Sequence, residues 1–509
     1  MKRKQLTTVM TLVLGALMTA GCDAYDYSDY IGAFNGSMYT SDFDMPTEQG
    51  GDKFDEFVDN PFVRTADECT STFSVDADGA AYSIMRRYVN KDWKVDCSSV
   101  RIEEYLNYFT FDYADPAGSE TVAINAEVGL CPWNAGHRLL RLGLKGQPIA
   151  KGQEPRANLV FLIDVSGSMD SPDKLELLKS GLMELLEALN PDDKISIITY
   201  SGEVKKLLEA TRVAHAATIR KAISKLSANG STAGGQAMKM AYEEALANYI
   251  EGGNNRVIMG TDGDFNVGVT NTDSLVKMVE SYARKGIYLT CCGFGSGNLN
   301  DGMMETISNK GNGTYQYIDC EEEMMKVFVH EASKFVAVAS DTKCQVTFDS
   351  TLVSRYRLIG YENRVMTNED FEDDTKDAGE IGAGQTITAL YEIVPTETFF
   401  NTLPSATAQR KVATFDVRYK KALGADSRPL TLDVTVGGAG ADPSSENLRF
   451  AAGVAAYGMV LRQSEYRGDA DIDMAIRLVD GARSFDPHGY RAELVKLMQK
   501  IKQSAWFNE

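Results

Sequence analysis

Two hydroxyls and a carboxylate alternate along one short stretch of the chain, at Asp164, Ser166 and Ser168. Their side chains offer three hard oxygens, which are the ligands that divalent cations such as Mg²⁺ prefer in proteins. The same residue types also cap helices, because their oxygens accept hydrogen bonds from the free backbone N–H groups of a first helical turn. A cation site and a simple helix cap are therefore both open interpretations of this stretch.

Two further stretches add polar residues of the same kind. Thr232 lies in a glycine-rich loop ahead of a helical pattern, and Asp262 follows an apolar run at residues 257–260. A similar apolar run, residues 159–163, leads into Asp164. Such runs are typical of strands buried on both faces of a parallel sheet, and α/β sheets bind ligands at the carboxyl edge of their strands. We therefore expect these side chains to meet at one sheet edge.

The order Asp-x-Ser-x-Ser, then Thr, then Asp resembles the metal-ion-dependent adhesion site of von Willebrand factor type A domains. On that resemblance the metal-binding positions are Asp164, Ser166, Ser168, Thr232 and Asp262. The resemblance implies an α/β fold, a doubly wound, mostly parallel, Rossmann-like sheet over residues 155–338. Ligands of this kind, without sulfur or imidazole, favour Mg²⁺, with Mn²⁺ and Ca²⁺ as alternatives.

Segments outside this domain carry a second resemblance, to a group of bacterial lipoproteins that contain such a domain. They are residues 71–76 and 100–104 upstream, 263–269 inside the domain and 357–363 downstream. This resemblance covers nearly the whole chain after the first residues. It implies no particular chemistry for the group.

The first residues predict export and lipidation. Three basic residues at positions 2–4 precede an apolar core at 9–20 that is too short to span a bilayer. Gly21 and Cys22 then resemble a lipobox, with Cys22 as the lipidated first residue of the mature protein. Thr19 stands where Leu is usual, so an ordinary signal peptide with a free Cys22 is the alternative. We expect a cell-envelope protein, periplasmic or surface-exposed, that is anchored to the membrane by acyl chains.

Length, charge and cysteine content restrict the number of domains, the classes of binding partner and the disulfide bonds to be expected. A chain of 509 residues predicts two to three domains of about 100–200 residues each. Its formal net charge of -20 argues against nucleic acid and anionic lipid surfaces as partners, since both require a basic surface. Its 8 cysteines are too scattered for a disulfide framework, although Cys69 and Cys97 are able to pair in an oxidising compartment.

Strand and helix patterns place the type A domain inside a second fold. Alternating strands are expected at residues 121–130 and 137–145, and similar strands return only after residue 338. Because a lone hairpin is marginally stable, the early pair should join the later set in one β-sandwich. The predicted order is a signal peptide at 1–22, a tether at 23–60, an α+β segment at 61–116, sandwich strands at 117–154, the type A domain at 155–338, the rest of the sandwich at 339–440 and a C-terminal helical bundle at 441–509.

Catalytic interpretations find no support in the sequence. No G-x-S-x-G, G-x-x-x-x-G-K-[ST] or H-E-x-x-H motif is present, and no general base is evident near the expected metal residues. We predict a binding protein and not an enzyme, whose metal receives an Asp or Glu carboxylate from a protein partner, with a carboxylated glycan as the runner-up. The alternative is an assembly scaffold of the cell envelope whose partners bind the sandwich and the helical domain.

Overall fold

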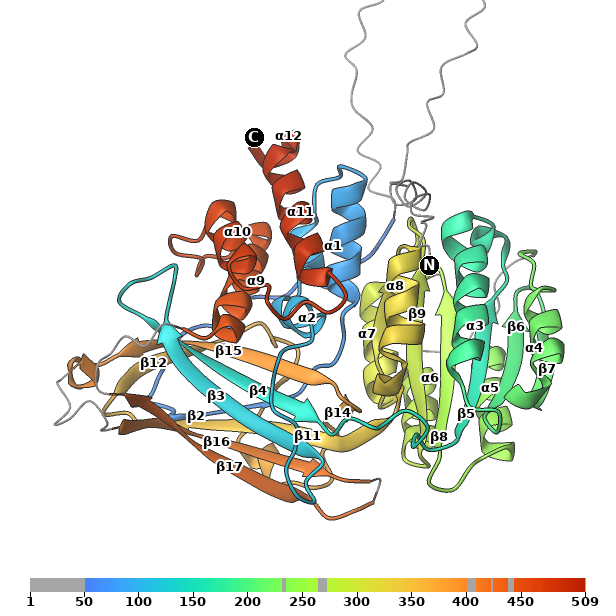
Figure 1. The fold of residues 1–509 in the computed structure, drawn as a ribbon, viewed down its shortest axis with the longest axis horizontal. Helices are drawn as coiled ribbons and strands as arrows, with labels where there is room; N and C mark the ends of the chain where they lie inside the picture. The colour runs from blue at the N-terminus through green and yellow to red at the C-terminus, as the bar shows by residue number, and fades with distance from the viewer. Residues whose placement is uncertain are drawn as a thin grey trace, which may run out of the picture. The chain divides into compact units, whose positions relative to one another are not determined.

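Three β-sheets organise the chain in the computed structural model, which describes residues 51–230, 235–263, 272–400, 409–422, 424–437 and 444–508. One sheet is mostly parallel and forms the centre of an α/β domain, and two antiparallel sheets form a sandwich (Figure 1). Cys22 and Thr232 lie outside the described residues. The predictions made for those two residues therefore stay predictions.

The α/β sheet has the strand order β10-β9-β8-β5-β6-β7, and its neighbouring strands are parallel except for the pair β6 and β7. The strands are β5 (Ala157–Asp164), β6 (Lys194–Tyr200), β7 (Val204–Arg212), β8 (Asn254–Thr261), β9 (Ile287–Phe294) and β10 (Tyr315–Ile318). Every residue of β5 is buried, as expected for a central strand that is covered on both faces. The strand order changes direction around β5, which is where doubly wound sheets bind ligands.

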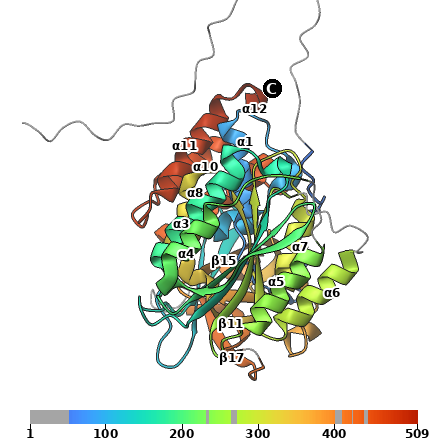
Figure 2. The same cartoon turned by 90° about the vertical axis from the view of Figure 1, so that its right-hand side faces the viewer.

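Helices cover both faces of this sheet (Figure 2). They are α3 (Leu177–Ala188), α4 (Ala216–Ile223) and α8 (Glu321–Met325) on one face, and α5 (Gly235–Ala247), α6 (Thr272–Ala283) and α7 (Asp301–Lys310) on the other. In α3, Leu178, Leu182 and Leu185 recur at helical spacing and are buried against the sheet. The predicted doubly wound α/β fold is confirmed.

The sandwich is built from strands on both sides of the α/β domain in the sequence. One sheet contains β1 (Val63–Arg64), β12 (Val353–Ile359), β15 (Thr386–Pro395), β4 (Arg138–Gly146) and β3 (Val122–Leu130), in that order. The other contains β13 (Val365–Met366), β2 (Thr70–Ser74), β11 (Ala337–Phe348), β16 (Gln409–Lys420) and β17 (Arg428–Gly437), with β14 (Gly379–Gly382) beside β11. Because β4 pairs with both β3 and β15, the α/β domain is an insertion in the sandwich, as predicted.

Helices from the two ends of the described chain share one core. They are α1 (Ala80–Asn90) and α2 (Ile102–Asn107) near the start, and α9 (Glu446–Arg462), α10 (Ile472–Asp480), α11 (Tyr490–Gln503) and α12 (Ala505–Asn508) at the end. In α9, a Cβ atom on Gly458 would lie only 2.9 Å from the Ile102 side chain, so the backbones of α9 and α2 approach closely. The N-terminal segment is thus integrated with the rest: α1 and α2 pack with the C-terminal helices, while β1 and β2 each join a sandwich sheet.

The last segment of the α/β domain is not one continuous helix. It comprises α8, a π-helical turn at Lys326–His330 and a 3₁₀ turn at Ala332–Phe335. Glu331 lies at the second junction and is bound by Lys326 at 2.8 Å and Lys334 at 2.7 Å. Cation pairing at this junction holds the turns together where a regular helix is interrupted.

Other features of the described chain concern cysteines, surface and membrane. Cys69 and Cys97 are unpaired, and the Cys97 thiol donates to the Leu461 carbonyl at 3.5 Å.

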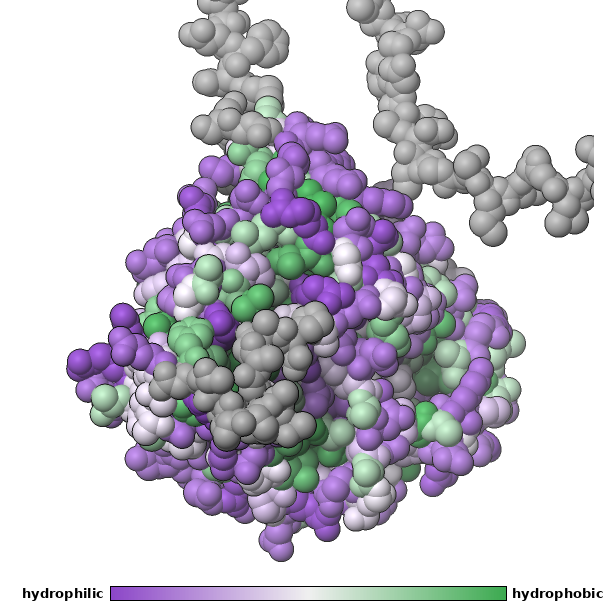
Figure 3. Space-filling view, turned by 60° about the vertical axis from the view of Figure 1, so that its left-hand side comes forward, coloured by the Kyte–Doolittle hydropathy of each residue, from purple (hydrophilic) through white to green (hydrophobic). Residues whose placement is uncertain are grey.

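Figure 3 shows hydrophobic side chains in scattered groups among hydrophilic ones on the face that it presents. Within the described ranges, no helix is both long and apolar enough to cross a membrane.

Candidate metal centre

The predicted metal residues meet at the carboxyl edge of the α/β sheet. Asp164 is the last residue of β5, and Asp262 directly follows the neighbouring parallel strand β8. Both carboxylates are fully buried. Ser166 is buried as well, whereas Ser168 is exposed, so the edge opens to solvent on the side of Ser168. Thr232 is not described, and four of the five predicted residues are therefore seen together.

Asp164 organises the turn that carries the two hydroxyls. Its Oδ1 accepts the backbone N–H of Ser166 at 2.8 Å, and its Oδ2 accepts the Thr261 hydroxyl at 3.2 Å. Burial raises the pKa of Asp164 to about 6, and the charge of Asp262 adds to this effect against the hydrogen bonds from Ser166. Burial thus disfavours the ionised form of Asp164, and a nearby cation would stabilise that form.

The hydroxyl of Ser166 does not act as a helix cap. Ser166 precedes a short 3₁₀ turn at Gly167–Met169 and makes no side-chain capping bond to it. Its Oγ lies 2.9 Å from the Oγ of Ser168, so the two hydroxyls face each other. Capping by Ser166, the alternative interpretation of the motif, is therefore absent from the structure.

A second loop approaches the same turn. The backbone N–H of Gly167 donates to the Gly230 carbonyl at 3.0 Å, and the N–H of Asn229 donates to the Val165 carbonyl at 2.6 Å. These contacts fix the start of the loop that continues to the predicted ligand Thr232. The described part of that loop thus begins beside the hydroxyl turn.

Lys174 is an unpredicted member of the site. Its Nζ lies 2.9 Å from Oδ2 of Asp262 and donates to the Ser168 carbonyl at 2.9 Å. The residue belongs to a π-helical turn, Pro172–Glu176, that leads into α3. The sequence motifs did not predict a role for Lys174 at this site. The available signal was a lysine six residues after Ser168, on the turn that follows the motif.

The residues present fit a small divalent cation. Oδ1 of Asp262 is buried and has no hydrogen-bond partner among the described residues, so this carboxylate oxygen is able to accept a cation. The Lys174 ammonium already binds the other oxygen and so marks a position where positive charge is stable. Asp164, Ser166, Ser168 and Asp262 would hold the ion, with Thr232 as the predicted fifth residue.

A second acidic cluster lies between the sandwich and the α/β domain, where the ligand atoms of Asp76, Asp78 and Glu305 lie within 4.8 Å of one another. Arg364 already pairs with all three, at 3.0, 3.5 and 3.3 Å respectively. Burial alone would lower the pKa of Arg364, but the charges of Asp76 and Glu305 outweigh burial and raise this pKa. This cluster, named here the interdomain cluster, therefore already contains a cation shared by its three carboxylates, although Oδ2 of Asp78 and Oε2 of Glu305 have no hydrogen-bond partner among the described residues.

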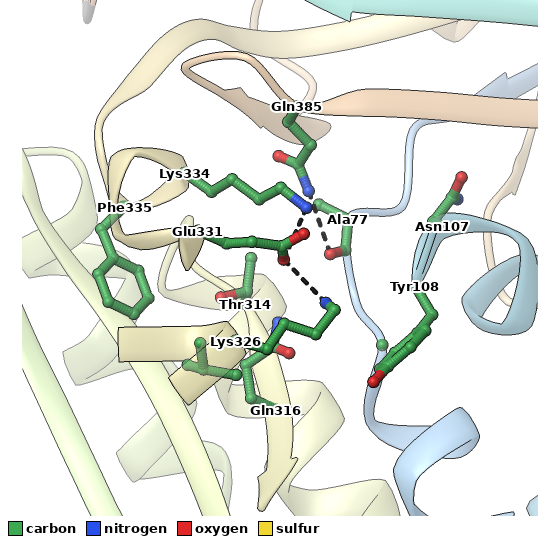
Figure 4. Close-up of a pocket in the computed structure, with 12 residues that line it drawn as sticks. Ala77, Asn107, Tyr108, Thr314, Gln316, Lys326, Glu331, Lys334, Phe335 and Gln385 are labelled. Atoms are coloured by element: carbon green, nitrogen blue, oxygen red, sulfur yellow. Dashed lines mark hydrogen bonds and ion pairs between the residues drawn. The ribbon is translucent and has the colours of Figure 1, made fainter. Parts of the chain in front are cut away.

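The small cavity in Figure 4 also has its charges paired. Lys326, Glu331 and Lys334 line it, and Glu331 faces both lysines. Burial opposes ionisation of Glu331, yet the two lysines outweigh it and lower the pKa of Glu331 to about 2. The cavity volume is about 30 Å³, close to the space of one water molecule. We assign this cavity to structure and not to ligand binding.

Comparisons with known families set the α/β domain apart from the segments on either side of it. Residues 158–330 match the family "von Willebrand factor type A domain", residues 48–141 match "von Willebrand factor", and residues 333–504 match "Uncharacterized protein YfbK, C-terminal". The match over residues 158–330 contains all four described residues of the metal edge. The expected type A domain is confirmed.

Individual relatives differ in how much of the chain they share. The chain is 36% identical to YfbK of Escherichia coli K12 over 468 residues, covering 88% of this chain and 81% of that protein. It is 29% identical to inter alpha-trypsin inhibitor, heavy chain 4, of Mus musculus over 190 residues, or 35% of this chain and 20% of that protein. A solved structure, von Willebrand factor type A from Catenulispora acidiphila, aligns with 76% of this chain and 91% of its own at 16% identity and a TM-score of 0.43.

Proposed function

Since this chain belongs to the YfbK family and carries a von Willebrand factor type A domain, we propose that it binds a protein partner through a divalent metal at the carboxyl edge of that domain. One observation supports this proposal most strongly. Oδ1 of Asp262 is buried and unpartnered within the described chain, at the sheet edge that also carries the facing hydroxyls of Ser166 and Ser168. Such a group is stabilised by a cation that also binds the hydroxyls.

We propose Mg²⁺ as the ion, with Mn²⁺ and Ca²⁺ as alternatives, because the donor set is made of hard oxygens. When bound, the ion supplies a positive charge that attracts an anionic oxygen from outside the protein. Asp164 and Asp262 hold the ion from the buried side, and the exposed Ser168 lies on the side that a partner reaches. The partner group that fits best is an Asp or Glu carboxylate on a protein loop.

Calorimetry with purified protein tests the metal. Mg²⁺ should bind to the EDTA-treated protein, and Asp164→Ala and Ser166→Ala should abolish binding, because each removes an oxygen from the site. Asp170→Ala is the matched control, since this exposed carboxylate lies on the same turn but outside the motif. Wild-type binding by both motif variants would show that the site is elsewhere.

Partner capture from the native envelope tests the binding function. Partners held by the metal should be lost on addition of EDTA and should also be lost from the Asp262→Ala variant. An assembly scaffold that works through the sandwich and the C-terminal helices would retain every partner in both conditions. If EDTA abolishes partner binding but substitution of Asp and Glu residues in the partner does not change it, only the carboxylate proposal is contradicted.

Lipid anchoring at Cys22 is the remaining part of the proposal. The basic start, the apolar core and Gly21-Cys22 support it. Cells grown with a labelled fatty acid should yield labelled wild-type protein and unlabelled Cys22→Ser protein. Label that persists in the variant, or that is missing from both proteins, would contradict the anchor and leave the metal proposal untouched.

A further inference from the structure

The Lys174 side chain reaches the metal edge from the first turn after the motif. Its ammonium bridges Oδ2 of Asp262 and the backbone carbonyl of Ser168, both at 2.9 Å. Only 10% of the Lys174 side chain is exposed, and Asp262 is fully buried. A charged group of this kind is retained in the interior only where it is paired and hydrogen-bonded.

The surrounding backbone is shaped to admit this side chain. Gly295, in the loop after β9, has a φ of +65°, and a Cβ atom there would overlap the aliphatic carbons of Lys174. Arg87 fixes this loop from the other side, because its Nη1 donates to the Gly295 carbonyl at 2.9 Å. The lysine therefore lies in a defined slot between the hydroxyl turn and the Gly295 loop.

The charges at the edge do not balance when Lys174 is the counter-ion. Asp164 and Asp262 carry two negative charges when ionised, whereas the ammonium carries one positive charge and pairs with one of the four carboxylate oxygens. Oδ1 of Asp262 has no partner within the described ranges. A divalent cation would balance both carboxylates and reach the oxygen that Lys174 leaves unsatisfied.

We propose that Lys174 is an internal competitor of the metal: its ammonium holds Asp262 in the metal-free protein and withdraws from Asp262 when a divalent cation binds. The inference rests on the proposed metal site and adds its mode of loading. An ammonium so close to Asp262 repels a divalent ion on the same carboxylate, because both are positively charged. The repulsion is strong where Asp262 is buried, since little water screens it. Lysine suits this role, since its compact charge sits on a flexible stem with four methylene groups.

Withdrawal of Lys174 also releases the hydroxyl turn. The ammonium is bound to the carbonyl of Ser168, the exposed residue of the motif. Metal loading therefore breaks a contact that fixes the turn on the side open to a partner. In the metal-free protein an internal ion pair therefore fixes the turn at this edge, and in the loaded protein Lys174 no longer holds it.

Calorimetric titration of Mg²⁺ into the EDTA-treated full chain tests the exchange. Lys174→Gln should bind Mg²⁺ about tenfold more tightly than wild type or better, because the competing charge is gone. Lys179→Gln is the matched control, since Lys179 lies on α3 and pairs with Glu176 away from the edge. Its affinity should equal that of wild type.

Equal or weaker binding by Lys174→Gln would overturn the exchange and leave the metal site intact. Absence of Mg²⁺ binding in wild type and in Lys174→Gln alike would overturn both proposals.

A measurement on the wild-type protein covers the case in which Lys174→Gln does not fold. Lysines are labelled briefly with acetic anhydride, with EDTA or with saturating Mg²⁺, and each site is quantified by mass spectrometry. Labelling of Lys174 should rise several-fold with Mg²⁺, while that of Lys179 stays unchanged. Labelling of Lys174 that is unchanged or reduced by Mg²⁺ would overturn the proposal.

Discussion

Two buried groups of carboxylates in this molecule are paired with different kinds of cation. In the interdomain cluster, the guanidinium of Arg364 contacts Asp76, Asp78 and Glu305 together. At the metal edge, a single flexible lysine contacts one oxygen of Asp262 and leaves the other unpartnered among the residues described. The interdomain cluster is paired with a planar guanidinium that contacts all three of its acidic residues, whereas the ammonium at the metal edge is flexible and contacts only one of the two; each group keeps buried carboxylate oxygens that have no hydrogen-bond partner among the described residues.

The comparison shows that the number of acidic residues does not identify a cation site. Three buried carboxylates lie close enough to hold a metal in the interdomain cluster, yet an arginine already occupies that role. The metal edge has only two carboxylates, but it adds hydroxyls and an exchangeable ammonium. Arginine cannot give up its proton and forms rigid multiple contacts, so an arginine-paired cluster serves structure.

The largest expected effect is at the interdomain cluster. Arg364→Met should lower the free energy of unfolding by about 3–5 kcal/mol, because it leaves three buried carboxylates without their shared cation. Urea denaturation measures the loss, and saturating Mg²⁺ should not restore it. Arg212→Met, which removes an exposed surface pair with Asp192, is the control and should change stability by less than about 0.5 kcal/mol. Full rescue of Arg364→Met by Mg²⁺ would mean that this cluster is the real cation site.

The matching change at the metal edge should depend on metal. In EDTA, Lys174→Gln should lose about 2–3 kcal/mol of unfolding free energy, because Asp262 loses its only described cation. With saturating Mg²⁺ the loss should disappear, since the divalent ion replaces the ammonium. Thermal unfolding in the two buffers measures this difference. A loss of the same size in both buffers would make Lys174 a structural residue like Arg364.

A pH dependence separates the two regions further. The pKa of Asp164 is raised from 3.8 to about 6, so its contribution to stability is present below pH 3.8 and is lost as the pH rises through about 6. In EDTA at pH 7, Asp164→Asn should therefore stabilise the protein, on the order of 2 kcal/mol. Denaturation curves should show that this stabilisation decreases towards pH 4. In Mg²⁺ the same variant should be less stable than wild type.

The matched change in the interdomain cluster should have the opposite sign. Burial raises the pKa of Glu305, but Arg101 and Arg364 outweigh this effect and lower it. Ionised Glu305 therefore stabilises the fold above its unfolded pKa, and Glu305→Gln should destabilise the protein at pH 7 with or without metal. Stabilisation by this variant would remove the distinction between the two regions.

The smallest expected effect concerns the slot of Lys174. Gly295→Ala should cost about 1 kcal/mol from the positive φ, plus a further loss in EDTA because the added methyl group displaces the lysine stem. Gly118→Ala is the control, since its φ is also +65° but a Cβ atom there meets nothing within 4 Å. The difference between the two variants isolates the contact with Lys174 and should shrink in Mg²⁺. An unchanged difference would contradict displacement of Lys174 by metal.

The arrangement of sheets was predictable because it depends on patterns that repeat along the chain. Continuous apolar runs marked β5 and β8, and the marginal stability of a lone hairpin placed β3 and β4 with the later strands. The meeting of Asp164 with Asp262 followed from the common edge of parallel strands. These inferences need only periodicity and general rules of sheet topology.

Side-chain networks were not predictable from such patterns. Lys174 was not predicted as part of the metal edge, because nothing local shows that its ammonium folds back onto Asp262. The segments that resembled a lipoprotein group gained meaning only in three dimensions. Asp76, Arg101 and Asn363, from three of these segments, meet α7 and its neighbours at the interdomain cluster. Contacts between residues hundreds of positions apart leave no local signal.

The most direct measurement is anomalous diffraction from crystals of the full chain grown with Mn²⁺, which replaces Mg²⁺ at oxygen sites. A single peak is expected about 2 Å from the hydroxyl oxygens of Ser166 and Ser168, with the Lys174 ammonium moved away from Asp262. A peak at Asp76, Asp78 and Glu305, with none at the carboxyl edge of the α/β sheet, would contradict the account.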